Sequence, residues 1–255
     1  MSDFRDLHRP GEPLLLPNAW DVASALALAA AGFAAIGTTS LGVAAAHGLP
    51  DGRERGKSET LELVRALRGR LGVPLTVDVE GGFGGGPDEV AELAAELYAA
   101  GAAGINLEDG RPGGVLAEAA DQAALIVAIK ERVPGLFVNA RTDTCWLRTR
   151  TGETESRCRA YRDAGADGLF VPALTEAGDI RMLAGIAPLN LLALPGMTVR
   201  ELAALGVARV STGSLLFRTA LTAAVSAARE IRAGAPVPGG VLSYAETNSY
   251  AEVES

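Results

Sequence analysis

Short apolar runs alternate with longer helix-like stretches along the chain. The apolar runs are three to five residues long and lack the alternation of a half-buried strand, which is typical of strands buried on both faces. Helical spacing fills the segments between them, most clearly at Asp21–Ala31, Pro87–Ala100, Ala117–Arg132, Glu153–Ala164 and Gly213–Arg232. Strict alternation of strand and helix predicts a parallel sheet.

A glycine-centred pattern recurs at 31–36 (AGFAAI), 100–105 (AGAAGI), 164–169 (AGADGL) and 205–210 (LGVARV). Each copy lies between a helix-like stretch and an apolar run, where a left-handed glycine ends a helix. The glycines lie 69, 64 and 41 residues apart, and one strand-plus-helix unit takes about 30–40 residues. Filling the gaps gives eight strands, at Leu14–Leu16, Ala34–Thr38, Leu75–Asp78, Gly104–Leu107, Phe137–Ala140, Gly168–Val171, Leu189–Ala193 and Ala208–Ser211.

Eight such units in about 230 residues predict an α/β fold of the closed (β/α)₈ TIM-barrel type. The alternative is a doubly wound open sheet, but no G-x-G-x-x-G opens a helix after the first strand, so a dinucleotide-binding version is disfavoured. We therefore predict a catalytic barrel over residues 1–235. Residues 236–255 have no clear period and are predicted to be a C-terminal arm or tail, either packed on another subunit or disordered.

Charge and hydropathy exclude two classes of partner. The net charge is −8 and no run of basic residues occurs, which argues against nucleic acid. The longest mainly apolar run, 25–37, spans 13 residues, whereas a membrane-spanning helix needs about 20. The N-terminus is charged and has no apolar signal core, so we expect a cytoplasmic protein without membrane contact.

Three scarce residue types narrow the chemistry further. Two cysteines, Cys145 and Cys158, and two histidines cannot supply a disulfide framework or a zinc site. Cys145 is predicted to be structural rather than reactive. The two lysines, Lys57 and Lys130, fall outside the strand ends, which argues against an imine-forming aldolase and favours a metal-stabilised enolate.

Acidic residues follow the predicted third and fourth strands. Asp78 and Glu80 are two apart and can share one face, and Glu108 lies at the same height on the next strand. Oxygen donors of this kind suit Mg²⁺, with Mn²⁺ as a substitute. Arg141 after strand five can hold a carboxylate through two hydrogen bonds, so we predict a small anionic 2-oxo acid as substrate. The alternative is a solvated acidic rim paired with local arginines.

Two polar turns and one loop surround this group. The turns TSLGV after strand two and STGS at 211–214 resemble anion-binding turns, although STGS is at least as compatible with an ordinary helix cap. Asp51 lies in a long loop that can fold over the barrel mouth, and His47 is predicted to be a loop residue near the site rather than a base. The glycines at 81–86 lack the residues of a phosphate-binding loop and predict a flexible loop.

These segments carry a family resemblance over nearly the whole chain. The chain resembles the isocitrate lyase/phosphoenolpyruvate mutase superfamily, and GTTSLGVA, DVEGGFG and NARTD are most similar to its phosphonomutase-like branch. The matching segments are LPNAWDVASA (16–25), AIGTTSLGVAAAHGLPDG (35–52), PLTVDVEGGFGGG (74–86), GINLEDG (104–110), VNARTD (138–143), AGADGLFVPAL (164–174) and ALPGMTVRELAALGVARVSTGSLL (193–216).

The resemblance implies a (β/α)₈ barrel that binds Mg²⁺ and a small 2-oxo or enolpyruvyl acid. It also implies an eighth helix exchanged between subunits, and hence a homo-oligomer, either dimer or tetramer. By the same resemblance, the backbone of Thr39, Ser40 and Leu41 holds the substrate carboxylate together with Arg141, and Asp51 contacts the reacting group or metal waters. The implied metal residues are Asp78, Glu80 and Glu108.

The loop after strand four departs from the family pattern. It reads EDGRPGGVLAEAADQ and lacks the Cys and His of the lyases and the Lys and Asn of the mutases, and Pro172 stands where the mutases have a histidine. Our first hypothesis is a Mg²⁺-dependent lyase that cleaves or forms a C–C bond next to a 2-oxo acid, such as oxaloacetate or a 2-methylisocitrate-like compound. The alternatives are P–C chemistry, as a phosphonomutase isomerase or phosphonopyruvate hydrolase, and a barrel that binds a metabolite without turnover.

Overall fold

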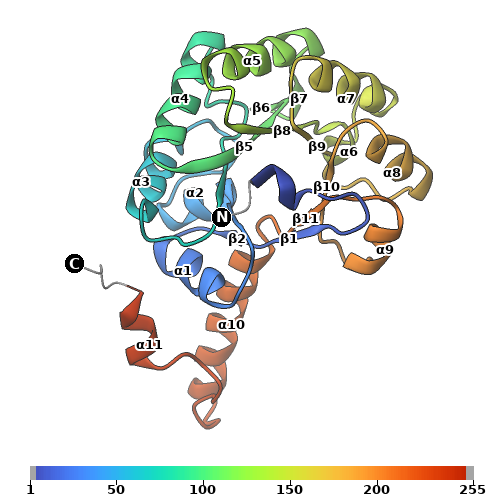
Figure 1. Cartoon of the computed structure of the whole chain (residues 1–255). Helices are drawn as coiled ribbons and strands as arrows, with labels where there is room; N and C mark the ends of the chain where they lie inside the picture. The colour runs from blue at the N-terminus through green and yellow to red at the C-terminus, as the bar shows by residue number, and fades with distance from the viewer. Residues whose placement is uncertain (1–3, 251–255) are drawn as a thin grey trace.

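A parallel sheet of nine strands forms the centre of the computed structural model, which describes residues 4–250 (Figure 1). Its order is β1-β11-β10-β9-β8-β5-β4-β3-β2. The strands are β1 (Leu14–Leu16), β2 (Asn18–Ala19), β3 (Ile36–Thr38), β4 (Leu75–Asp78), β5 (Ala102–Glu108), β8 (Phe137–Arg141), β9 (Gly168–Phe170), β10 (Leu189–Leu192) and β11 (Arg209–Ser211).

The sheet closes on itself through its first strand. β1 and β2 stand at the two ends of the order, yet only Pro17 separates them in the chain. β1 pairs with β11 and β2 pairs with β3, so the two segments act as one strand interrupted at a residue without a backbone N–H. The predicted eight-stranded barrel is therefore confirmed, and the open-sheet alternative is wrong because both edges are paired.

Helices surround the barrel on its outside, whereas the short helices α2 (Ser40–Ala46) and α6 (Thr144–Leu147) follow the carboxyl ends of their strands (Figure 1). The other helices up to α10 are α1 (Val22–Ala30), α3 (Lys57–Leu67), α4 (Pro87–Ala99), α5 (Ala119–Arg132), α7 (Thr154–Asp163), α8 (Ala177–Ala184), α9 (Val199–Ala204) and α10 (Leu215–Arg232). Outward strand residues such as Ile105 and Leu107 pack with Ile126 and Ile129 of α5 in the main core. The four repeated glycines have φ between +86° and +105°, which confirms their role in ending α1, α4, α7 and α9.

A short 3₁₀ helix, η1 (Phe4–Leu7), closes the end of the barrel where the strands begin. The rings of Phe4 and His8 contact Phe137 at centroid distances of 5.3 and 4.3 Å. Gly104 faces this group, where a Cβ would lie 3.0 Å from Phe4. With this end filled, the carboxyl ends of the strands are left as the open mouth.

Several short elements were not predicted because they are shorter than a recognisable period. The turn TSLGV begins α2, and the loop after β5 forms a hairpin of β6 (Gly110–Arg111) and β7 (Val115–Leu116). A 3₁₀ turn, η2 (Thr151–Glu153), precedes α7.

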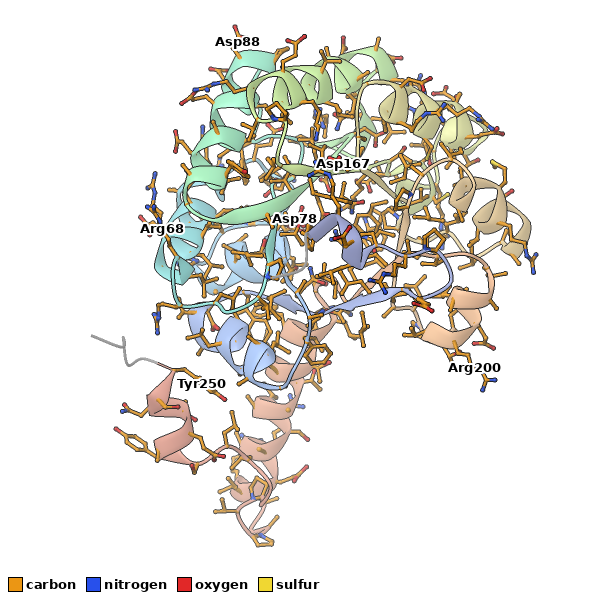
Figure 2. All side chains as sticks on the ribbon, in the orientation of Figure 1. Arg68, Asp78, Asp88, Asp167, Arg200 and Tyr250 are labelled. Carbon is orange, nitrogen blue, oxygen red and sulfur yellow. The ribbon has the colours of Figure 1, made fainter. Side chains whose placement is uncertain are left out.

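The C-terminal part extends away from the barrel (Figures 1 and 2). Phe217 is the buried residue of α10, and the segment that the sequence left without a period contains α11 (Tyr244–Ser249). The limits 1–235 and 236–255 stay a prediction, and residues 1–3 and 251–255 within them lie outside the described residues. None of the described helices is long and apolar enough to cross a bilayer.

Candidate active site

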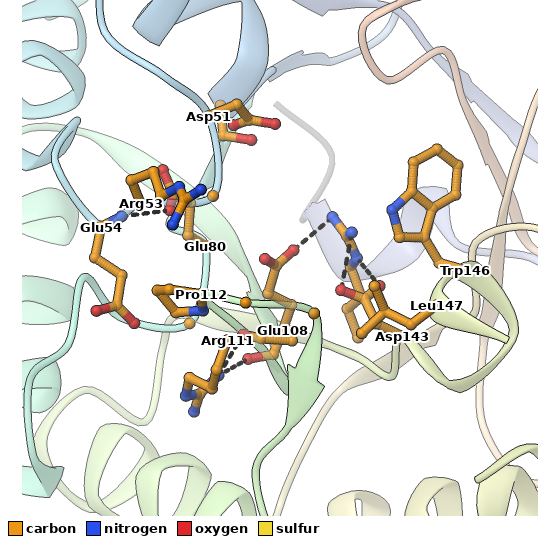
Figure 3. A pocket seen from close by; sticks show the side chains of 17 residues that line it. Asp51, Arg53, Glu54, Glu80, Glu108, Arg111, Pro112, Asp143, Trp146 and Leu147 are labelled. Atoms are coloured by element: carbon orange, nitrogen blue, oxygen red, sulfur yellow. Dashed lines mark hydrogen bonds and ion pairs between the residues drawn. The ribbon is translucent and has the colours of Figure 1, made fainter. Parts of the chain in front are cut away.

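Two adjoining pockets open at the carboxyl ends of the strands. The inner pocket, ≈ 120 Å³, reaches down to Asn106 between the ends of β3, β4, β9, β10 and β11. The outer pocket, ≈ 360 Å³, lies between the loop after α2 and the β6–β7 hairpin (Figure 3). Ser40, Asp51, Arg141 and Trp146 line both of them.

All the site residues predicted from the sequence line one pocket or both. The inner pocket is lined by Thr39, Ser40, Leu41, Asp51, Asp78 and Arg141, and the outer pocket by Asp51, Glu80, Glu108 and Arg141. They come together because residues at the carboxyl ends of neighbouring parallel strands meet at one rim of a barrel.

Arg141 lines both pockets and is clamped by two carboxylates. Its Nη1 is 2.6 Å from Glu108 Oε2, and its Nε and Nη2 donate to Asp143 at 2.6 and 3.1 Å. Its guanidinium also lies 5.5 Å from the ring centroid of Phe170. Burial disfavours its charge, but the carboxylates around it outweigh burial and raise the pKa of Arg141. The side chain is therefore a fixed cation facing both pockets.

Asp143 is a site residue that the sequence prediction did not include. It is buried, and it forms the bidentate pair with Arg141, two residues before it in the NARTD segment. Gly110 in the hairpin lets it approach, because a Cβ there would lie 2.4 Å from Asp143 Oδ2. The signal available in the sequence was this pairing of Arg and Asp at one strand end.

A buried network behind the rim fixes the end of β8. Asp109 accepts hydrogen bonds from Thr142 Oγ1 and Asp143 N, both at 2.8 Å, and from Tyr161 Oη at 2.7 Å. Arg157 Nη1 adds an ion pair at 3.0 Å, and the side chains of Arg157 and Asp109 are both fully buried. Arg141 and Asp143 therefore project from a backbone segment that is held in place.

The acidic residues repel one another at short range. Burial raises the pKa of Glu80 to about 7, and the negative charges of Asp78 and Asp51 add to this rise. The hydrogen bond that Glu80 Oε2 accepts from Glu54 N acts in the opposite direction and lowers the pKa. Burial also raises the pKa of Glu108, although the positive charge of Arg141 opposes this rise. Burial likewise raises the pKa of Asp51, and the negative charge of Asp78 raises it further. This surplus of negative charge calls for a cation.

The donor chemistry of the site fits a hard, well-hydrated cation. The acids offer oxygen ligands, and Mg²⁺ takes one or two carboxylates and completes its shell with water and substrate oxygens. Within residues 4–250, however, no group of three or more Asp, Glu, His or Cys side chains is arranged so that it could hold a metal ion. A cation at this site would therefore be held by fewer protein ligands together with water, and oxygen donors without His or Cys do not suit zinc.

Both predicted anion-binding turns use backbone donors within the protein. At the start of α2, beside the inner pocket, Ser40 N donates to Asp78 Oδ2 at 3.4 Å and Thr39 N donates to the carbonyl of Ala19 at 3.1 Å. In the STGS turn, Asn18 Oδ1 accepts from Thr212 N at 3.0 Å and from Gly213 N at 2.9 Å. Those two backbone donors are occupied, which favours the structural interpretation of that turn.

The β6–β7 hairpin lies in the loop after β5, whose sequence departs from the family pattern. Arg111 Nη1 donates to the carbonyls of Glu108 and Gly110 at 2.7 and 2.8 Å, and Arg111 Nη2 donates to Gln122 at 2.9 Å (Figure 3). Cys145 lines neither pocket and packs against the core, with Sγ 4.0 Å from Thr154 Oγ1. His47 is exposed and lines neither pocket.

The inner pocket is also lined by apolar side chains. They are Leu41, Phe170, Pro172 and Leu192, with Trp146. Among the described residues that line this pocket, charge is confined to Asp51, Asp78 and Arg141. The pocket therefore presents both charged and apolar groups to a ligand.

Comparisons with known proteins agree with this geometry. An uncharacterised protein of Mycobacterium tuberculosis is 47% identical over 247 residues, which cover 95% of this chain and 93% of that protein. The 2-methylisocitrate lyase of Bacillus subtilis is 34% identical over 200 residues, covering 74% of this chain and 65% of the lyase. A crystal structure of phosphonopyruvate hydrolase with oxalate and Mg²⁺ superposes with a TM-score of 0.85 at 25% identity, covering 98% of this chain and 93% of that one.

The family itself follows from a match to most of the chain. The model of the phosphoenolpyruvate phosphomutase family matches residues 4–232. These residues include the whole barrel and every side chain that lines the two pockets. The chain therefore belongs to the phosphoenolpyruvate phosphomutase family, within the isocitrate lyase/phosphoenolpyruvate mutase superfamily.

Proposed function

We propose that the protein is a Mg²⁺-dependent lyase that cleaves a C–C bond next to a small 2-oxo acid, with oxaloacetate as the simplest substrate. The observation that carries this proposal is that one pocket is lined both by charged groups, Arg141 and Asp78, and by apolar side chains, Phe170, Pro172 and Leu192.

The charged and polar lining residues are the groups that a 2-oxo carboxylate needs. Arg141 is the fixed cation for the carboxylate, and the turn at 39–41 lines the same pocket. In the proposal, Asp78, Glu80 and Glu108 hold the cation directly or through water, and Asp51 orients the reacting group. Mg²⁺, when bound, would draw electron density from the 2-oxo group and favour an enolate.

The apolar lining favours loss of an uncharged fragment. A second carboxylate that packs against these apolar side chains loses hydration without gaining a cation of its own, which raises its energy relative to neutral CO₂. In oxaloacetate the C3–C4 bond breaks, its electron pair moves into the C2–C3 bond to form the enolate, and CO₂ leaves. The enolate then takes a proton at C3 from water and becomes pyruvate.

Relatives with assigned activities support both this chemistry and one alternative. A 2-methylisocitrate lyase is among the relatives at 34% identity, and the phosphonopyruvate hydrolase structure holds oxalate and Mg²⁺. P–C cleavage is the second candidate because that hydrolase and the matching family act on phosphorus compounds by name. The inner pocket argues against it, since Arg141 is the single cationic side chain among its described lining residues, whereas a phosphonate carries up to two charges.

The experiment that tests the proposal offers four substrates in parallel. Protein with Mg²⁺ is mixed with oxaloacetate, 2-methylisocitrate, phosphonopyruvate or phosphoenolpyruvate, and proton and phosphorus NMR follow pyruvate, glyoxylate and phosphate. Metal-dependent pyruvate from a carbon acid supports the lyase. Turnover of a phosphorus compound alone replaces it with P–C chemistry, and no turnover with oxalate still bound indicates a barrel that only binds.

A further inference from the structure

We propose that Asn106 contacts a substrate oxygen at the floor of the inner pocket, and that Arg209 is the positioning residue that orients its amide. The inference rests on the proposed function, because it takes the occupant of the pocket to be a small acid. It concerns a polar group one layer below the rim, deeper in the barrel than Glu80 and Glu108, and it assigns a role to two residues that the proposed reaction leaves unused.

The orientation of the Asn106 side chain is fixed by two donors. Asn106 lies on β5, beside Asp78 of β4 and Asn139 of β8 in the strand register, and it lines the inner pocket. Its Oδ1 accepts from Asn139 Nδ2 at 2.9 Å and from Arg209 Nη2 at 3.1 Å. A guanidinium can only donate, so the oxygen of the amide must face Arg209.

The nitrogen of the same amide is therefore available to a ligand. Among the described residues, no acceptor bonds to Asn106 Nδ2. The side chain lines a pocket whose other polar groups include the carboxylates of Asp51 and Asp78 and the guanidinium of Arg141. An amide N–H is a donor for carboxylate or 2-oxo oxygens and is not a ligand for Mg²⁺. Asn106 thus recognises the acid and not the cation.

Arg209 is a buried cation with few bonds of its own. It lies on β11 with an exposed fraction of 0%, and its Nε and Nη1 have no hydrogen-bond partner among the described residues. Burial lowers the pKa of Arg209 to about 9, which Asp78 opposes, so the side chain stays charged at neutral pH. His8 adds no second positive charge there, because burial, together with Arg209, lowers the pKa of His8 to about 3.

Burying Arg209 inside the barrel costs free energy. An apolar side chain of similar volume would avoid desolvating a charge and burying the unpaired nitrogens Nε and Nη1. In its place Arg209 fixes the orientation of the Asn106 amide, and it puts a positive charge beneath a pocket that receives an anion. Both effects act on the bound acid, so its removal is expected to weaken acid binding without weakening metal binding.

The test measures oxalate and metal affinity separately by titration calorimetry. Oxalate is titrated at saturating Mg²⁺, and Mn²⁺ is titrated alone. We expect Asn106→Asp, which places a carboxylate oxygen where the N–H was, to weaken oxalate binding by about tenfold or more. We expect Arg209→Gln to weaken oxalate binding by about three- to tenfold and to leave Mn²⁺ binding unchanged or tighter, since a nearby positive charge is removed.

The control is Thr76→Val, at a buried position on β4 beside Gly104 in the strand register. Thr76 Oγ1 has no partner among the described residues and Thr76 does not line the inner pocket, so we expect both affinities to stay within twofold. Unchanged oxalate binding in Asn106→Asp overturns the inference and leaves the proposed function standing. Equal losses of oxalate and Mn²⁺ affinity in Arg209→Gln also overturn it, because that pattern indicates a merely structural residue. Wild-type protein that binds Mn²⁺ but not oxalate overturns the proposed function, and the inference with it.

Discussion

The clamp around Arg141 depends on contacts too close to tolerate an added methyl group. Asp143 holds two nitrogens of the guanidinium, and Glu108 holds the third. Gly110 lies so near to Asp143 that the position has no room for a side chain. At this scale, the geometry of the site is set by single atoms.

Gly110→Ala tests the clamp. The new Cβ would displace the Asp143 carboxylate and free Arg141 to shift, so we expect the KM for the 2-oxo acid to rise about tenfold. Steady-state kinetics measure the effect. Gly178→Ala is the matched control, because a Cβ there meets nothing within 4 Å, and it should leave KM unchanged. An unaltered KM in Gly110→Ala would show that Asp143 does not position Arg141.

The raised pKa of Glu80 predicts a pH-dependent metal affinity. The pKa of Glu80 is about 7 in the fold, against 4.5 for a glutamate side chain free in water. Below about pH 7 the metal-free folded protein therefore keeps Glu80 protonated. This proton binding stabilises the fold at low pH, and the stabilisation is lost as the pH rises from about 4.5 to 7. A cation competes with the same proton. We therefore expect Mg²⁺ to bind about tenfold more tightly at pH 8 than at pH 6, measured by calorimetry.

Glu80→Gln is the control for this titration. The amide carries no proton to displace, so the pH dependence between 6 and 8 should become much shallower, while affinity at pH 8 falls. A wild-type affinity that is the same at both pH values would contradict the assignment of Glu80 to the metal site.

Substitution of Cys145 is predicted to leave the activity unchanged. Its Sγ lies near Thr154 and its side chain packs against the core, away from both pockets. We expect Cys145→Ser to keep kcat/KM within about twofold. A loss of several orders of magnitude would mean that this thiol takes part in the reaction as an acid.

At the scale of elements, the barrel could be predicted because its strands repeat a strong local signal. All eight predicted strands are present, and the glycines of the repeated pattern adopt the left-handed conformation. The acids and Arg141 followed from their place just after apolar runs. The pattern therefore located the rim of the barrel, which is the part of the site that lies at strand ends.

Elements and residues that depend on contacts across the barrel could not be predicted in the same way. The β6–β7 hairpin and α6 are too short to show a period. Asp143 required knowledge of its distance to Arg141, and Asn106 and Arg209 required the register that brings β5 and β11 to one interior layer. Buried polar residues on strands look like ordinary interruptions of an apolar run until their partners are known.

At the scale of the whole molecule, α10 has an apolar stripe that the barrel does not cover. Leu221, Val225 and Ile231 are 53%, 49% and 46% exposed, and the helix extends away from the other elements (Figures 1 and 2). The resemblance implies that this eighth helix is exchanged between subunits. We therefore expect a homo-oligomer of two or four chains in which α10 packs on another copy.

Val225→Glu tests this assembly by light scattering after gel filtration. A charge in the stripe should shift the protein toward the 26.1 kDa monomer. Val127→Glu, the same change at a 40% exposed position on α5, is the control and should leave the mass unaltered. A wild-type protein that already elutes as a monomer would contradict the expectation.

The central claim is that a divalent cation and a small 2-oxo acid occupy the pocket together, and oxalate binding tests it most directly. Calorimetry is carried out with wild-type protein with Mg²⁺ and with chelator, and with Asp78→Asn. The account predicts oxalate binding that is at least about a hundredfold tighter with Mg²⁺, with this difference reduced in Asp78→Asn because the two ligands are thermodynamically linked. Oxalate that binds equally well without Mg²⁺, or that does not bind at all, would contradict the account.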